Sequence, residues 1–144
     1  MFEAGSKTDP SATATSATGW GVLRGIDAGE LAIRCAEHHV VTPGGSLPDP
    51  THFDSGSLLT IDIMLADPAV DFDGGDLCTL EKDGTLVSAG LAAPGDAVVF
   101  VSHKMHCVRP VTRGVREVLV IELWRGEPVR VCVCTSFFPP FSVM

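Results

Sequence analysis

The stretch APGDAVVFVSHKMHCVRPVTRGVREVLVIELW, at residues 93–124, decides the fold class. Two apolar runs of strand length, AVVFV at 97–101 and EVLVIELW at 117–124, enclose a segment that is rich in Gly, Pro and polar residues. Short apolar runs bounded by turn residues are typical of β-strands rather than of helices. This stretch therefore predicts two strands with a polar connection between them.

The same texture continues towards the N-terminus. Further strand-length runs are LAIRCAEHHVV (31–41), LLTIDIML (58–65), DLCTL (76–80) and TLVSAGL (85–91). The Pro-, Gly- and Asp-rich segments between them, at 43–50, 67–75 and 82–84, predict turns. Residues 28–37 also fit a helical spacing, but the β-branched pair that follows at 40–41 favours a strand. Many short strands at close spacing predict an all-β barrel or sandwich with little helix.

The chain divides into three parts. Residues 1–27 are rich in Ser, Thr, Ala and Gly without apolar periodicity, which predicts a disordered or truncated lead-in. Residues 28–127 hold the strand-like runs and predict a single domain. Residues 128–144 predict one alternating strand, PVRVCVCTSFF, and a short tail.

Composition excludes several classes of function. The 144 residues carry 10 basic and 18 acidic side chains, and the net charge of −8 argues against a nucleic-acid partner. Because no run approaches the roughly 18 apolar residues of a membrane span and no signal peptide is visible, we expect a cytoplasmic protein without a membrane partner. Five cysteines without CxxC pairs predict free thiols rather than a disulfide scaffold or structural zinc.

A candidate metal site begins at His52 and Asp54. Residues two apart on an extended strand point to the same side, so this pair can share one metal ion. A third ligand must come from elsewhere, and the segment after AVVFV offers His103 and His106. Two histidines and one carboxylate leave coordination positions open, as in non-haem Fe(II) oxygenases. The adjacent pair at 38–39 faces opposite ways on a strand and predicts a structural role.

Arg116 is the second candidate site residue. It lies ten residues after His106 and leads a strongly apolar run, where a buried guanidinium is costly unless it meets an anion. A carboxylate is the partner that arginine suits best, because the two groups can form paired hydrogen bonds.

Three segments in this order, HFDSGSLLTIDIML (52–65), FDGGDL (72–77) and the stretch 93–124, resemble the iron- and 2-oxoglutarate-dependent dioxygenases, in particular the prolyl 4-hydroxylase-like branch. The segment at 106–116 matches the family pattern HxVxPVTxGxR. The resemblance implies a double-stranded β-helix, a jelly roll similar to cupins. It makes His52, Asp54 and His106 the iron ligands, with His106 preferred to His103 because the pattern continues from it. It makes Arg116 the residue that binds the distal carboxylate of 2-oxoglutarate.

The resemblance also implies an activity. Fe(2+), 2-oxoglutarate as cosubstrate and L-ascorbate would support hydroxylation of a C–H bond by O₂, with 2-oxoglutarate converted to succinate. The substrate would be a small molecule or a peptidyl group, a prolyl residue by analogy. Relatives often bind the cosubstrate with a tyrosine as well. This chain has no tyrosine, so a hydroxyl such as that of Thr60 is expected to take this part.

Two alternatives remain open from the sequence. One is a β-barrel binding module that keeps the metal site or its shape without turnover. The other is a cupin-like metal enzyme that needs no 2-oxoglutarate. Both predict a barrel, but only the hydroxylase requires the anion-binding role of Arg116.

Overall fold

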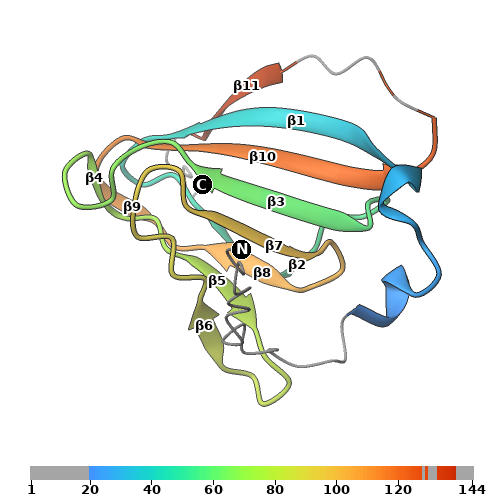
Figure 1. Ribbon diagram of the computed structural model, residues 1–144. Coiled ribbons are helices and arrows are strands. Elements are labelled where there is room, and N and C mark those ends of the chain that lie inside the picture. Colours follow the sequence, from blue (N-terminus) through green and yellow to red (C-terminus); the bar gives the residue numbers. More distant parts are fainter. Residues whose placement is uncertain (1–19, 128, 130–132, 139–144) are drawn as a thin grey trace, which may run out of the picture.

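The computed structural model describes residues 20–127, 129 and 133–138 (Figure 1). Two short 3₁₀ helices, η1 (Trp20–Leu23) and η2 (Ala28–Glu30), precede the first strand. The strands are β1 (Leu31–Val41), β2 (Leu47–His52), β3 (Leu59–Met64), β4 (Phe72–Gly74), β5 (Leu77–Leu80), β6 (Leu86–Ser88), β7 (Ala97–Val101), β8 (His106–Val108), β9 (Val111–Gly114), β10 (Arg116–Arg125) and β11 (Val133–Phe138). No helix among the described residues has the length and apolar character to cross a membrane.

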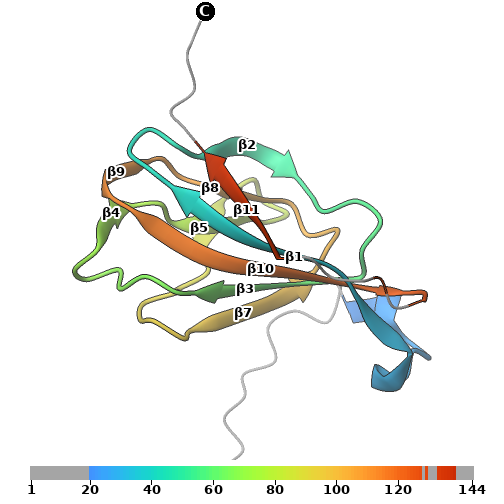
Figure 2. The same ribbon diagram turned by 90° about the horizontal axis from the view of Figure 1, so that it is seen from above.

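The strands form two larger sheets and one short ribbon. One sheet has the order β11-β1-β10-β3-β7, the second has the order β2-β8-β5-β6, and β4 pairs with β9. All neighbours are antiparallel except β11, which runs parallel to β1. Figures 1 and 2 show the five-stranded sheet lying over the four-stranded one. This architecture confirms the predicted all-β, jelly-roll fold class.

The sequence alternation explains which face of the larger sheet is buried. On β3, Thr60, Asp62 and Met64 are buried, while the residues between them are partly exposed. On β10 the buried Val118 lies directly opposite Met64, so the two strands present one inner face. The apolar half of this face packs into one core: Val41, Met64, Ala66, Phe72, Val111 and Val118. The other half carries polar side chains.

Some boundaries differ from those that the sequence predicts. Strand β1 covers 31–41 as expected, and only η2 represents the helical alternative. The segment 43–50, predicted as a turn, holds most of β2, which contains Pro48 and Pro50. Strand β2 lies at the edge of its sheet, where a missing N–H is tolerated. The segments 67–75 and 110–114 also contain short strands, β4 and β9. The predicted lead-in up to residue 19 and most of the tail lie outside the described residues.

Candidate metal centre

His52 and His106 face each other across two paired strands. His52 is the last residue of β2 and His106 the first of β8, and the antiparallel register makes them direct partners. Their rings meet edge to face with centroids 5.0 Å apart. Side chains of directly opposite residues project from the same face of a sheet. The pairing of β2 with β8 thus brings His106 close to His52 and Asp54, although His106 lies 52 residues after Asp54 in the chain.

Asp54 completes the cluster from the loop that follows β2. Its Oδ1 lies 3.2 Å from Nε2 of His52 and 3.7 Å from Nε2 of His106. The ligand atoms of the three residues all lie within 4.8 Å of one another, as one metal ion requires. The backbone N–H of Asp54 donates to the carbonyl oxygen of Ser102 (2.9 Å), which ties this loop to the end of β7.

The two oxygens of the Asp54 carboxylate have different partners. Thr60 donates its hydroxyl proton to Oδ2 (2.6 Å), and the Ser102 hydroxyl lies 3.0 Å from Thr60 Oγ1. Both hydroxyls are buried, Thr60 with 1% of its surface exposed and Ser102 with none. Oδ1 is therefore the oxygen left facing the two histidines.

The hydrogen bond of His106 selects one tautomer. Its Nδ1 lies 3.0 Å from the carbonyl oxygen of Lys104, which can only accept, so Nδ1 carries the proton. The lone pair is then on Nε2, the atom that faces Asp54. His103, the other candidate, is exposed in the turn between β7 and β8, and its ring packs beside Phe53 at 5.8 Å. The structure thus brings His106, and not His103, to the other two residues.

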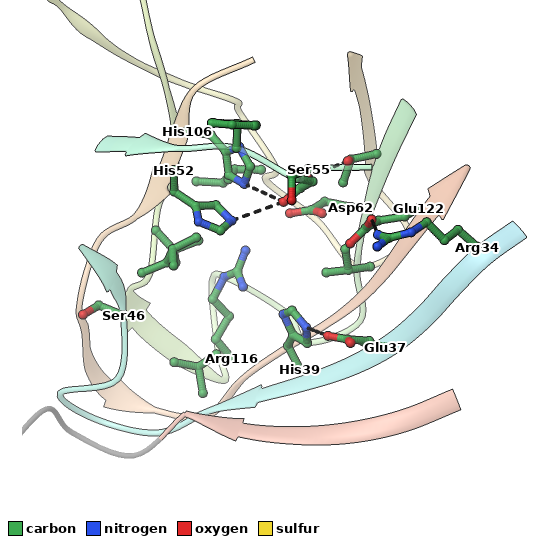
Figure 3. Close-up of a pocket in the computed structure, with 18 residues that line it drawn as sticks. Arg34, Glu37, His39, Ser46, His52, Ser55, Asp62, His106, Arg116 and Glu122 are labelled. Carbon is green, nitrogen blue, oxygen red and sulfur yellow. Dashed lines mark hydrogen bonds and ion pairs between the residues drawn. The ribbon is translucent and has the colours of Figure 1, made fainter. Parts of the chain in front are cut away.

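Arg116 lies in the same cavity and is buried there. Only 2% of the residue is exposed, and Nε and Nη2 have no hydrogen-bond partner among the described residues. Figure 3 shows its guanidinium pointing into the cavity below the histidines. Burial lowers the pKa of Arg116, while Asp62 and Asp76 act in the opposite direction. A buried guanidinium without hydrogen bonds is costly, so this arrangement is suited to an anionic ligand.

A glycine makes room for this arginine. Gly75, in the GG pair of the FDGGDL segment, has a positive φ of 68°. A Cβ atom there would lie 2.7 Å from Cδ of Arg116. Side chains are therefore excluded at Gly75 both by backbone conformation and by the path of Arg116.

Thr60 is the residue whose hydroxyl was expected to help bind the cosubstrate. It lines the cavity, but its single hydroxyl proton is donated to Asp54. A carboxylate of a cosubstrate can only accept hydrogen bonds, so this proton is not available to it in the arrangement observed. The structure places Thr60 as a support for Asp54.

The cavity has a volume of about 430 Å³ and extends from the cluster along the inner face of the larger sheet. Five charged or ionisable side chains on this wall were not predicted as site residues: Arg34, Glu37, His39, Asp62 and Glu122. Strand alternation could have identified two of them, because Glu37 and His39 lie two apart on β1 and face the same side. His39, predicted to be structural, lines the cavity and bonds Glu37 Oε2 through Nε2 (2.7 Å).

Asp62 is the most buried carboxylate of this wall. Only 6% of the residue is exposed, and it forms no hydrogen bond or ion pair with any residue that the structure describes. Burial raises the pKa of Asp62 to about 6, with Arg116 opposing the shift and Asp54 adding to it.

Fold and cluster together define a class of protein: a jelly-roll barrel that presents two histidines, one aspartate and a buried arginine inside its mouth. Comparisons with known proteins agree with this class. The chain is 42% identical over 87 residues to a PKHD-type hydroxylase of Sphingopyxis alaskensis, covering 55% of this chain and 38% of the relative. No family model matches the chain.

Two solved structures share the fold. A Pseudomonas putida prolyl-4-hydroxylase superposes with a TM-score of 0.52 at 23% identity, covering 63% of this chain and 52% of the other. A 2OG-Fe(II) oxygenase family oxidoreductase from Burkholderia pseudomallei gives a TM-score of 0.50 at 20% identity, with 62% and 43% covered. The two solved structures show a shared fold, and the sequence similarity to a PKHD-type hydroxylase agrees with the resemblance drawn from the motifs. The chain spans less than two fifths of the length of the curated relative.

Proposed function

We propose that this chain forms the catalytic core of an Fe(II)- and 2-oxoglutarate-dependent hydroxylase. The observation that carries the proposal is the buried Arg116, whose Nε and Nη2 lack partners among the described residues and which shares one cavity with the three metal-binding candidates. A metal site alone would not need a buried cation beside it. A dicarboxylate that binds both the metal and an arginine explains why the two features occur together.

Each residue has a defined part in this proposal. His52, Asp54 and His106 would hold Fe(2+) through Nε2, Oδ1 and Nε2, the atoms that face one another. Arg116 would bind the distal carboxylate of 2-oxoglutarate through its two unpaired nitrogens. The Thr60 hydroxyl occupies Oδ2 of Asp54, so Asp54 can offer one oxygen and leave positions open for cosubstrate and O₂.

When bound, iron and 2-oxoglutarate supply oxidative decarboxylation to succinate and CO₂ together with hydroxylation of a substrate C–H bond. The protein residues bind and orient the iron and the cosubstrate and exclude water. They do not act as acids or bases. L-ascorbate would keep the iron reduced. The Sphingopyxis relative is a PKHD-type hydroxylase and the Pseudomonas protein is a prolyl-4-hydroxylase, which supports hydroxylation here. By analogy with the Pseudomonas protein, a prolyl group is one candidate substrate.

An anaerobic titration tests the proposal. Fe(II) and then 2-oxoglutarate are added to the purified protein, and the visible charge-transfer band of an iron-chelated 2-oxo acid is recorded. We expect the band in the wild type and in His103→Ala, and its absence in His106→Ala. Iron binding without a band would contradict the proposal and favour a cupin-like metal protein. Absence of iron binding would favour a barrel without turnover.

A second variant separates the metal from the cosubstrate. Arg116→Ala should retain Fe(II) binding and lose 2-oxoglutarate affinity by about a hundredfold, because it removes a charge-assisted pair of hydrogen bonds in a buried site. Equal 2-oxoglutarate affinity in wild type and Arg116→Ala would show that the cosubstrate does not use this arginine. Succinate formation measured in parallel reports whether the bound cosubstrate is consumed.

A further inference from the structure

The wall of the cavity beyond Arg116 is built from three neighbouring strands. Val120 on β10 lies directly opposite Glu37 on β1 and directly opposite Asp62 on β3. Glu122 follows two residues after Val120 and therefore points to the same side. Three carboxylates thus surround one valine on the inner face of the sheet, and all four residues line the cavity. We refer to Glu37, Asp62 and Glu122 as the carboxylate wall (Figure 3).

The three carboxylates differ in their partners. Glu122 accepts hydrogen bonds from Arg34 (2.7 Å) and from the Ser57 hydroxyl, and Glu37 bonds His39 (2.7 Å). Asp62 makes no such contact with the described residues, although only 6% of it is exposed. Leaving a buried carboxylate without a donor costs free energy, so its retention in a cavity wall indicates a donor that arrives with a ligand.

A β-bulge brings a cationic side chain to the carboxylate wall. In the pairing of β1 with β10, Ile33 faces Leu123 and Cys35 faces Glu122, so Arg34 is the extra residue. Bulges redirect a side chain, and here the arginine reaches Glu122 and Ser57 at the cavity edge. Arg34 therefore pairs with Glu122 and does not donate a hydrogen bond to Asp62.

The charge of the cavity with metal and cosubstrate bound also favours a cationic ligand. A divalent cation on Asp54 and a dicarboxylate on Arg116 would cancel each other, which leaves the carboxylate wall to set the charge of the remaining space. Three carboxylates against Arg34 and His39 keep that space negative whether or not the imidazole is protonated. The chain as a whole carries −8. A negative cavity in an acidic protein concentrates cations.

We propose that the substrate of this site carries a positively charged nitrogen, an amine or the ammonium group of an amino acid, which donates to Asp62 from the cavity side. This inference rests on the proposed hydroxylase function and adds to it the chemical class of the substrate. Glu37 and Glu122 lie around the same valine and add to the attraction. The C–H bond to be hydroxylated would belong to the same molecule.

The test measures binding rather than turnover. The protein is loaded anaerobically with Fe(II) and 2-oxoglutarate, and the melting temperature and the charge-transfer band are followed during addition of matched probes. The probes are the proteinogenic amino acids, each with its N-acetyl form, and butylamine with butan-1-ol. We expect at least one ammonium compound to bind about tenfold or more tightly than its partner without the ammonium group.

Asp62→Asn should reduce the preference for the ammonium compound about tenfold. The affinity for 2-oxoglutarate should stay within about threefold of wild type. Asp73→Asn is the matched control, because Asp73 is exposed, pairs with Arg113 and lies outside the cavity. If no ammonium compound binds more tightly than its partner, or if Asp62→Asn keeps the preference, the inference is wrong. A large loss of 2-oxoglutarate affinity in Asp62→Asn would assign Asp62 to the cosubstrate instead. A missing charge-transfer band in the wild type would contradict the proposed function itself.

Discussion

At the scale of single residues, the site depends on how the Asp54 carboxylate is held. Thr60 occupies Oδ2 at 2.6 Å, Ser102 supports Thr60 at 3.0 Å, and the backbone N–H of Asp54 is bonded to the Ser102 carbonyl. Three contacts thus fix both the loop and the orientation of the carboxylate. Partners of this kind orient a metal ligand and raise the affinity of its site.

Thr60→Val removes the hydroxyl with little change of volume and should weaken Fe(II) binding about tenfold, because Asp54 loses the group that orients it. Thr60→Ser keeps the hydroxyl and should bind Fe(II) nearly as well as wild type. Anaerobic titration with Fe(II) measures both affinities, and melting temperatures show whether each variant is folded. Equal affinities in the Val and Ser variants would contradict the positioning role of Thr60.

The sequence predicts part of this site for identifiable reasons. The spacing of His52 and Asp54 places them together on any extended chain, and the motif that ends at Arg116 singles out His106. The role of Thr60 depends on which atom accepts its proton, and that follows only from the packing of β3 against the loop after β2. Likewise, Asp62 belongs to the cavity because β3 lies beside β10, a pairing between distant segments of the sequence.

At the scale of elements, β10 carries Arg116 at its start and the β4–β5 connection makes room for its side chain. Gly75→Ala should therefore displace the arginine, because the new Cβ would lie 2.7 Å from Cδ of Arg116. We expect a loss of 2-oxoglutarate affinity of about tenfold or more with Fe(II) binding retained. Binding of the two ligands, measured separately on the anaerobic protein, tests this.

Gly84→Ala is the control for backbone strain. Gly84 also has a positive φ, 84°, but a Cβ there would meet nothing within 4 Å. Both variants should lose roughly 1 kcal/mol of stability from the left-handed conformation, since only glycine adopts it without cost. Only the Gly75 variant should lose 2-oxoglutarate affinity. A similar loss in both variants would attribute the effect to strain rather than to the path of Arg116.

Strands that lie within an apolar or alternating run were predictable, and those without such a run were not. Strands β1, β3, β7 and β10 follow apolar or alternating runs that the sequence displays clearly. Strand β2 contains two prolines and reads as a turn, yet it forms because its partner β8 supplies the pairing at a sheet edge. Strands β4, β8 and β9 have only three or four residues, too few to show a periodicity. The short β8 nevertheless aligns His106 with His52.

At the scale of the whole molecule, the cavity interrupts the core of the larger sheet. One half of the inner face packs Met64 and Val118 into the apolar cluster, and the other half exposes Asp62 and Glu122 to the cavity. Polar groups buried without partners reduce stability, and proteins keep them where function needs them. The ionised Asp62 should therefore lower the free energy of unfolding, by an amount that depends on pH.

The folded protein binds a proton on Asp62 more tightly than the unfolded chain does, because burial raises its pKa from 3.8 to about 6. Below about pH 4 both states hold the proton. As the pH rises from about 4 to about 6 the unfolded chain releases it first, so this group lowers the stability of the fold progressively, by about 3 kcal/mol in total above that range. Asp62→Asn cannot ionise and avoids this loss.

Urea unfolding of the metal-free protein between about pH 4.5 and about pH 7.5 measures the difference in free energy of unfolding between Asp62→Asn and wild type. The advantage of Asp62→Asn over wild type should grow with pH by about 2 kcal/mol across that range. Asp73→Asn should differ from wild type by a nearly constant amount over this range, because the hydrogen bond with Arg113 lowers the pKa of Asp73 from an ordinary value of 3.8 that already lies below the range. A pH-independent difference between Asp62→Asn and wild type would mean that Asp62 keeps an ordinary pKa. The buried carboxylate would then be solvated within the cavity, and it would exert no cost that a cationic ligand could relieve.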